Sequence, residues 1–304
     1  MKTIIADDGA ALHVLVRGHG PPVVLLHGWA ADHSVWHPII AELIKNYTVY
    51  AWDARGHGFQ PQSGHGFQPQ SGYGFQPQSG HGGRASAGSE PPTVTRMARD
   101  LRAVIRHFGL EKPALVAHSM GVLVVWQMLA DFGCDGVGSL CLIDQSPRLM
   151  TDADWRLGIY GDWTEARDRA FMADLRLDFA ETVLRLIAYG RNEKARLNYE
   201  ADSRGMQKMR AALRLCIPEP LITCWASLTG ADYRMLLPLI TVPTLLVYGG
   251  ASNYYDAETV RYVANRCPGA ALHVFEGADH SPHFADRERF LNVLRCFIDD
   301  AAGA

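Results

Sequence analysis

Neither sign of charge dominates this chain. It carries 29 Lys and Arg residues against 32 Asp and Glu, which gives a formal net charge of −3 over 304 residues. Proteins that hold nucleic acid or an anionic membrane by charge usually have a marked basic excess. The balance lacks that signature, and we expect neither nucleic acid nor a membrane as a partner.

Long hydrophobic runs are also absent. No stretch approaches the ~20 apolar residues that a transmembrane helix needs. The apolar run at residues 1–5 reaches Asp7, Asp8 and Gly9 too soon for a signal peptide. With 48% hydrophobic and 20% charged residues, the composition is typical of a globular protein with a large core. We expect a cytoplasmic protein.

Cysteine is sparse and scattered. None of the six cysteines forms a Cys-x-x-Cys pair, which argues against a redox or metal-binding motif. Free thiols in a reducing compartment are the expected state. We therefore expect no metal and no cofactor.

Short apolar or β-branched runs alternate with segments of helical periodicity. The predicted strands cover residues 23–26, 47–52, 114–117, 140–143, 244–248 and 271–275. The predicted helices cover residues 35–44, 94–108, 121–129 and 284–298, with one more between the last two strands. This alternation predicts an α/β fold with a mostly parallel central sheet and helices on both faces. Ligands of such sheets bind beyond the carboxyl ends of the strands.

The alternation breaks once. Residues 147–237 show mostly helical periodicity, rich in Arg, Asp, Leu and Trp, and the sheet pattern resumes at Val242. We interpret this segment as a helical cap inserted after the strand that ends at Ile143. The expected organisation is a core formed by residues 1–146 and 238–304, with the cap at 147–237.

A tandem repeat occupies residues 56–83. The unit Gly-His-Gly-Phe-Gln-Pro-Gln-Ser occurs three times in succession, with Tyr in place of His in the third copy. One aromatic and no aliphatic residue per copy leave too little to bury, so we expect an exposed loop. A metal site formed by His57, His65 and His81 is the less favoured alternative, because glycine-rich loops rarely hold ligands in place.

Residues 117–121, Ala-His-Ser-Met-Gly, follow the predicted strand 114–117 and open the predicted helix 121–129. In this setting a tight, strained turn presents the central hydroxyl at the sheet edge, and small flanking residues permit the turn. The usual pattern is Gly-x-Ser-x-Gly, and Ala117 replaces the first Gly with the next smallest side chain. We predict Ser119 as a nucleophile; a serine that merely caps the helix is the alternative.

At these residues the chain resembles the α/β-hydrolase fold family, in its branch of small esterases, lactonases and cofactor-free haloperoxidase-like enzymes. Matching segments extend nearly end to end. They are His27-Gly28-Trp29 followed by Trp36, Asp53-Ala54-Arg55-Gly56-His57-Gly58, the Ser119 turn, Val242-Pro243 and Gly277-Ala278-Asp279-His280. The repeat departs from the family, where Arg-Gly-His-Gly is normally followed by Ser and a much shorter loop. The resemblance also implies that Asp53 and Arg55 form a structural pair or turn.

The resemblance implies which histidine activates the serine, since a neutral serine is a weak nucleophile. The family's catalytic histidine occupies the place of His280, just past the strand that ends at Phe275. His283, three residues later, is the rival. His118, beside the nucleophile, is common in the family and is expected to be buried rather than catalytic.

An oxyanion hole needs two backbone N–H groups directed at the developing negative charge. One is expected from Met120, directly after the nucleophile. The resemblance places the other at Trp29, after His27 and Gly28. Only the amides take part, so these roles depend little on residue type.

Two aspartates are candidates for the acid that orients His280. The family commonly places Asp after the strand that here ends at Tyr248, but Ser252 or Asn253 stands at that place. Asp256 lies a few residues late and is suited to cap a helix. Some members carry the acid one strand earlier, at the place of Asp144, and then often have Ser at the later site. We favour Asp144, with Asp256 as the alternative acid and the absence of a strong acid as the last option.

The identity of the nucleophile limits the types of reaction that we expect. Haloalkane dehalogenases and epoxide hydrolases of this fold use Asp as nucleophile, which Ser119 argues against. We expect hydrolysis of a carboxylic ester of a small, mostly apolar substrate through an acyl-enzyme. A lactonase, a carbon–carbon bond hydrolase or a perhydrolase are the alternatives. A non-catalytic small-ligand receptor on the same scaffold is disfavoured by the intact Ser119, His280 and oxyanion segment.

Aromatic residues of the cap are candidates for an apolar substrate pocket. Trp155, Trp163 and Trp225 are the expected substrate-binding residues, with Phe171 and Tyr189 as further candidates. Several of them are equally suited to form the core of the cap itself. The sequence carries no indication of the oligomeric state.

Overall fold

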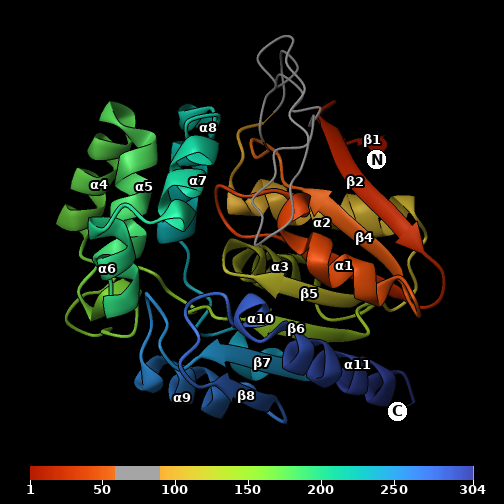
Figure 1. The fold of residues 1–304 in the computed structure, drawn as a ribbon. Coiled ribbons are helices and arrows are strands. Elements are labelled where there is room, and N and C mark those ends of the chain that lie inside the picture. Colours follow the sequence, from red (N-terminus) through yellow and green to blue (C-terminus); the bar gives the residue numbers. More distant parts are fainter. Residues whose placement is uncertain (59–89, 304) are drawn as a thin grey trace.

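A twisted sheet with helices on both faces forms the centre of the molecule (Figure 1). The computed structural model describes residues 1–58 and 90–303. Within them, eight strands lie in the order β1-β2-β4-β3-β5-β6-β7-β8. The strands are β1 (Lys2–Ile5), β2 (Ala11–Gly18), β3 (Pro22–Leu26), β4 (Thr48–Asp53), β5 (Ala114–His118), β6 (Ser139–Ile143), β7 (Thr244–Gly249) and β8 (Ala271–Phe275). β2 pairs antiparallel with β1 and β4, and the remaining pairs are parallel, which confirms the predicted α/β class.

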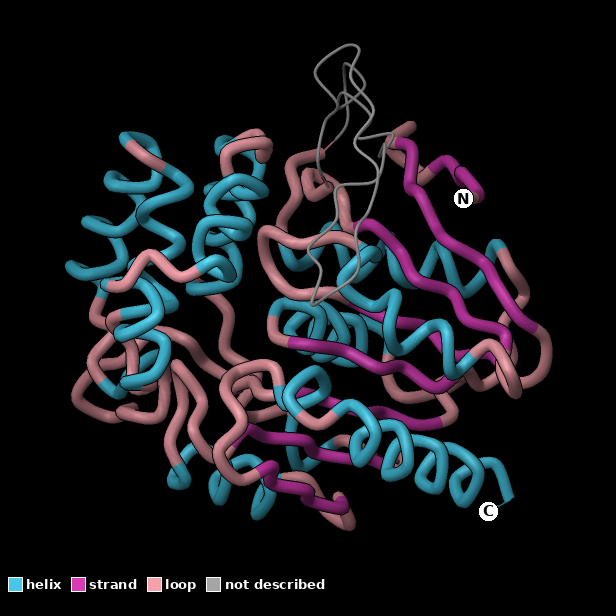
Figure 2. Tube along the Cα trace, viewed as in Figure 1, coloured by secondary structure: helices cyan, strands magenta, loops and turns pink. Residues whose placement is uncertain are grey.

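The helices alternate with the parallel strands, as Figure 2 shows. They are α1 (His37–Leu43), α2 (Val94–His107), α3 (Met120–Phe132), α4 (Glu165–Leu177), α5 (Phe179–Ala188), α6 (Glu193–Glu200), α7 (Arg204–Leu213), α8 (Pro218–Thr229), α9 (Ala257–Arg266), α10 (Pro282–Ala285) and α11 (Arg287–Gly303). Within the described ranges, no helix is long and apolar enough to cross a membrane.

Both faces of the sheet are buried, because successive side chains of a strand point to opposite faces. In β3, Val24 and Leu26 belong to the core covered by α2, α3 and α9. Val23 and Leu25 belong to the core covered by α1 and α11. A continuous apolar run is typical of such a strand, which is why the central strands can be read from the sequence.

The segment between β6 and β7 is helical. Helices α4 to α8 fall within the expected cap at residues 147–237, and Figure 1 shows them gathered on the side to which the β7 arrow points. An isolated bridge between Arg148 and Asp232 joins the start of this segment to its end. The helices therefore stand over the carboxyl ends of the parallel strands.

β1 and β2 are not among the strands predicted from the sequence. In β2 only Leu12 and Val14 are buried, while Ala11, Arg17 and Gly18 are exposed. A strand near the sheet edge is only half covered, so it lacks the long apolar run of a central strand. Most of the octapeptide repeat lies outside the described residues, so the expected loop and the metal alternative at His65 and His81 stay predictions.

A buried ion-pair network joins the N-terminal hairpin to the sheet and α2. Arg55 donates to both carboxylate oxygens of Asp100, at 2.5 and 2.7 Å, and to Asp8 at 2.6 Å. Asp53 instead accepts from His33 at 2.7 Å. The expected structural role of Asp53 and Arg55 is present, but they pair with different partners and not with each other.

Replacing Arg55 with Met should lower the free energy of unfolding by about 3 kcal/mol, because it leaves two buried carboxylates short of a partner. Urea denaturation measures this. Arg176→Met is the matched control: its pair with Glu219 is exposed on both sides, at 3.4 Å, and should contribute less than about 1 kcal/mol. Equal losses in the two variants would contradict the structural role of the network.

Candidate active site

Ser119 occupies the turn between β5 and α3. Its φ of 53° and ψ of −118° are rare for a residue other than glycine, and such backbone strain clusters at functional sites. Its backbone N–H donates to the carbonyl of Ile143 at 3.1 Å, which fixes the turn to the end of β6. The hydroxyl makes no hydrogen bond that caps α3. The alternative role as a capping serine is therefore unsupported.

The small residues of the turn have distinct physical reasons. A Cβ on Gly121 would lie 2.7 Å from the carbonyl oxygen of Leu26 and 2.8 Å from its Cβ, so α3 can approach β3 this closely only with glycine. Ala117 is completely buried within β5, where the structure accommodates its methyl group. The departure from Gly-x-Ser-x-Gly therefore leaves the turn intact.

The structure brings His280 and Asp144 together at this edge. Nδ1 of His280 lies 3.3 Å from Oδ1 of Asp144. Asp144 follows β6, is fully buried and has a φ of 48°. This contact engages one ring nitrogen of His280 and leaves the other, Nε2, available. The two atoms are close but are not aligned as a hydrogen bond, and catalytic contacts of this kind commonly tighten only when substrate binds.

The carboxylate of Asp144 is held from the next strand. The backbone N–H of Gly249 donates to Oδ2 and the hydroxyl of Ser252 donates to Oδ1, both at 3.0 Å. Ser252 stands where the family commonly has its acid. In this chain the residue at that place supports the carboxylate of the preceding strand instead of replacing it.

The alternative acid, Asp256, lies elsewhere. Its Oδ1 accepts from the backbone N–H groups of Glu258 and Thr259, at 2.9 and 3.1 Å, as the N-cap of α9. Its other oxygen pairs with Arg191 at 3.1 Å. Both oxygens thus have structural partners, and neither contacts His280.

His118 positions the loop of His280. Its Nε2 lies 2.8 Å from the carbonyl oxygen of His280. Burial and the neighbouring His280 lower the pKa of His118 to about 3. The ring is therefore neutral, and Nε2 carries the proton because a carbonyl can only accept. His283, the rival base, is fully buried against Trp36, and burial lowers its pKa well below the usual value.

The loop that contains Trp29 lies directly beside Ser119. A Cβ on Gly28 would be 3.4 Å from the Cβ of Ser119. His27 fixes this loop: its Nε2 accepts from the backbone N–H of Ala54 at 3.0 Å, so its Nδ1 carries the proton and donates to the carbonyl of Gly28 at 2.8 Å. The amide of Met120 belongs to the first turn of α3, where N–H groups have no partner within the helix.

The helices of segment 147–237 hold the side chain of Trp29. Its indole N–H donates to the carbonyl of Leu221 in α8 at 2.9 Å. Its ring centroid lies 4.8 Å from that of Trp225 in α8 and 5.7 Å from that of Phe179 in α5. The loop that contains Trp29 is therefore held both by the helical segment and, through His27, by the core of the sheet.

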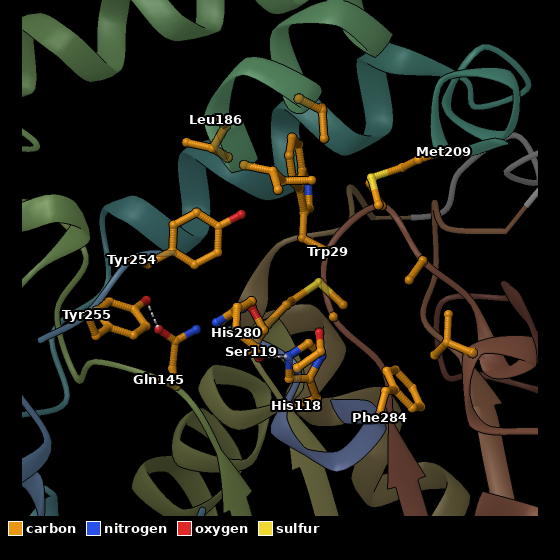
Figure 3. A pocket seen from close by; sticks show the side chains of 18 of the residues that line it. Trp29, His118, Ser119, Gln145, Leu186, Met209, Tyr254, Tyr255, His280 and Phe284 are labelled. Atoms are coloured by element: carbon orange, nitrogen blue, oxygen red, sulfur yellow. Dashed lines mark hydrogen bonds between the residues drawn. The ribbon is translucent and has the colours of Figure 1, made fainter. Parts of the chain in front are cut away.

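A cavity of about 1060 Å³ joins these groups (Figure 3). Ser119, His280, Gly28, Trp29 and Met120 all line it. Its upper wall comes from α5, α7 and α8, and includes Val183, Leu186, Met209, Leu213, Trp225 and Leu228. At the other end it reaches the exposed residues 286–288 at the start of α11. The cavity thus has an enclosed apolar part and an opening to solvent.

Two of the three expected substrate-binding tryptophans do not line this cavity. Trp155 packs against Tyr262, and its indole N–H donates to the carbonyl of Arg148. Trp163 packs against Phe171, with its N–H on Asp168 at 2.9 Å. Trp163 belongs to the apolar core, whereas Trp155 packs against α9, so the expectation of substrate contact is corrected for both.

Trp225 does line the cavity, although its indole N–H also donates to Asp168, at 2.8 Å. Of the further candidates, Phe171 packs on Trp225, 4.9 Å between ring centroids, and Tyr189 is 51% exposed. Neither lines the cavity. An aromatic residue in a predicted cap can serve its core, its surface or the cavity, and the sequence pattern does not separate these.

Among residues 1–58 and 90–303, one cluster has metal-binding residue types. Asp32, His33 and Asp53 place one ligand atom each within 4.8 Å of one another. Asp32 already caps the N–H of Ser34 at 2.8 Å, and Asp53 accepts from the backbone and the ring of His33. These contacts give each residue a structural role. His57, from the repeat motif, is buried with its Nδ1 on the carbonyl of Arg55.

Gln145 and Tyr254 also line the cavity, and the sequence analysis names neither as a site residue. The sequence contains a signal for each of them: Gln145 directly follows Asp144, the favoured acid, and Tyr254 comes two residues after Ser252, beyond the next predicted strand. The carboxyl ends of β6 and β7 are adjacent in the sheet, so polar residues just beyond them meet at the site.

The comparisons with known proteins agree with this architecture. Residues 23–293 match the model of the alpha/beta hydrolase family. The chain is 26% identical over 290 residues to a pimeloyl-[acyl-carrier protein] methyl ester esterase of Aliivibrio salmonicida, covering 95% of this chain and 96% of that protein. Its fold is similar to that of an esterase from Exiguobacterium antarcticum, with a TM-score of 0.77, 23% identity and 98% of each chain covered.

A further similar structure is the enol-lactonase from Burkholderia xenovorans, with a TM-score of 0.72, 19% identity, and 98% of this chain and 100% of that one covered. At such identities the likeness to both solved structures concerns the fold. The family match spans most of the chain, including the Ser119 turn and His280. This protein belongs to the alpha/beta hydrolase family.

Proposed function

We propose that this protein hydrolyses carboxylic esters of small, mostly apolar substrates through an acyl-enzyme on Ser119. The observation that carries the proposal is the arrangement of Ser119 on its strained turn, beside His280 and its buried partner Asp144, at one apolar cavity. The esterase names of the curated relatives support the same reaction class.

The first half of the reaction forms the acyl-enzyme. Oγ of Ser119 attacks the ester carbonyl carbon while His280 takes the hydroxyl proton. The carbonyl oxygen becomes an oxyanion, for which the amides of Trp29 and Met120 are the donors. When the carbon–oxygen bond to the alcohol breaks, His280 returns the proton to the leaving oxygen. Asp144 stabilises the protonated imidazole between these steps.

The second half releases the acid. A water molecule gives a proton to His280 and attacks the acyl carbon, and the bond to Ser119 then breaks as Oγ regains the proton. The acyl group stays attached to the protein until this point, so it needs an enclosed site, whereas the alcohol must leave earlier. The apolar part under α5, α7 and α8 suits the acyl group, and the opening at residues 286–288 suits the alcohol.

A short-chain chromogenic ester and an organophosphonate test the proposal together. The protein should turn over the ester, and the phosphonate should label Ser119 once per chain and stop turnover, because it reacts only with an activated serine. Peptide mass spectrometry locates the label. Binding of the ester without turnover would favour a receptor on this scaffold. Labelling elsewhere with Ser119 untouched would contradict the assigned nucleophile.

A substrate panel separates the related reactions. Open-chain esters, lactones, activated carbon–carbon substrates, and peroxide with an acyl donor can be compared by kcat/KM. We expect open-chain esters to be the best substrates. The pimeloyl-[acyl-carrier protein] methyl ester named for the relatives belongs in the panel as one candidate.

A further inference from the structure

Gln145 faces the cavity with its amide nitrogen. Its side-chain oxygen accepts from the backbone N–H of Ser146 at 2.9 Å and from the hydroxyl of Tyr255. The amide cannot be reversed, because its NH₂ group would then meet the N–H donor of Ser146. Figure 3 shows the nitrogen end directed away from Tyr255, on the side of His280.

The nitrogen of Gln145 has no hydrogen-bond partner among the described residues, although the residue is only 3% exposed. Its backbone is fixed as well, since the hydroxyl of Tyr248 donates to its carbonyl oxygen at 2.7 Å. The fixed oxygen and the fixed backbone hold the two N–H donors of this amide toward the cavity that Gln145 lines. A ligand oxygen that reaches this position can accept from them.

Tyr254 supplies a second polar group on the same side of the cavity. Its ring lies edge-on to His280, with centroids 4.5 Å apart, and stacks on Tyr160 at 5.9 Å. These contacts hold the ring, and Figure 3 shows its hydroxyl in the cavity. No described group hydrogen-bonds to this hydroxyl, which leaves it free to donate.

Apart from His280 against the ring of Tyr254, the surroundings of these two groups are mostly apolar. Leu149, Ile159, Leu186 and Ile187 line this part of the cavity. Of the Lys and Arg residues in the described part of the chain, only Arg287 lines the cavity, and it lies at the solvent opening. A carboxylate would lose its hydration here without gaining a partner of opposite charge, a large penalty. A neutral acceptor is therefore the matching ligand.

We propose that Gln145 and Tyr254 form a subsite for a second, neutral carbonyl oxygen in the acyl part of the substrate. A carbonyl oxygen has two lone pairs and can accept from the amide N–H and the phenol O–H together. The subsite lies in the enclosed part of the cavity, which the reaction assigns to the acyl group. This inference rests on the proposed ester hydrolysis and narrows its substrates to oxo-acyl esters.

The test compares ethyl hexanoate with ethyl 4-oxohexanoate and ethyl 5-oxohexanoate. The readout is the ratio of kcat/KM for each oxo ester to that for the plain ester, which cancels changes in the general activity of a variant. Tyr254→Phe removes one donor and should lower the ratio for the better oxo ester roughly 5- to 10-fold, the scale of one hydrogen bond.

Gln145→Glu gives an independent measurement. It keeps the shape and the oxygen that accepts from Ser146 and Tyr255, but it replaces the donor with an acceptor. The ratio should fall at least as far as in Tyr254→Phe. If this variant does not fold, Tyr254→Phe decides alone. Tyr262→Phe, whose ring packs on Trp155 away from the cavity, is the matched control and should leave the ratio unchanged.

The outcomes separate the two proposals. Turnover of the esters with the same ratio in wild type, Tyr254→Phe and Gln145→Glu would overturn the subsite and leave the ester hydrolysis standing. Absence of turnover of all esters, with no phosphonate label on Ser119, would overturn the proposed function and the subsite with it.

Discussion

Replacing Ser119 with alanine should lower kcat for ester hydrolysis on the order of 10⁶-fold, the scale that a serine protease loses with its nucleophile. The reason is that His280, the oxyanion donors and Asp144 act only through the bond that Ser119 forms. The fold should persist, because the hydroxyl of Ser119 caps no helix and alanine can adopt the φ and ψ of this turn about as readily as serine. Initial rates with a chromogenic ester and a thermal melt measure both effects.

Ser203→Ala is the matched control for that experiment. Ser203 caps α7, where its hydroxyl accepts from the N–H of Met206. Its loss should reduce stability by about 1 kcal/mol and leave kcat near the wild-type value. A Ser119→Ala variant that is destabilised yet active would reverse the roles and show that Ser119 is a structural serine.

Asp144→Asn should lower kcat on the order of 10⁴-fold, as the corresponding change does in a serine protease. An amide in this place no longer stabilises a protonated His280 and favours the wrong ring tautomer. Asp256→Asn should change kcat only a few-fold, and asparagine is as good an N-cap as aspartate, so α9 should persist. Steady-state kinetics of the two variants on one ester give the comparison.

A third variant, compared with these two, tests how the carboxylate of Asp144 is held. Ser252→Ala removes the hydroxyl that donates to Asp144 and should lie between the two in its effect, since Gly249 still donates to the carboxylate. A larger loss in Asp256→Asn than in Asp144→Asn would overturn the choice of acid. The role proposed for Ser119 would be unaffected, because it rests on the strained turn between β5 and α3.

The helical segment over the sheet connects the wall of the cavity to the loop of Trp29. Trp225 lines the cavity and also packs on Trp29, whose indole is bonded to α8. Asp168 in α4 accepts from both Trp163 and Trp225. Trp163 and Trp225 thus help to hold the wall of the cavity, and Trp225 also packs on the residue beside Ser119.

Local pattern in the sequence was sufficient for several features of this fold. Short apolar or β-branched runs marked the six parallel strands, and the runs of the central strands β3, β5 and β6 are the clearest because these strands are buried on both faces. Small residues around Ser119 marked the strained turn, because only they fit between strand and helix. The half-covered strands β1 and β2 have no comparable pattern and were not predicted.

Other features depend on which chain segments meet in the folded protein. The sequence left Asp144 and Asp256 open as the acid, since both follow strands; the fold brings Asp144 to His280 and leaves Asp256 on a helix end. The fold likewise places Trp225 at the cavity and leaves Trp155 and Trp163 outside it. Side-chain direction and the packing of distant segments set these outcomes, and neither is encoded in a short stretch of sequence.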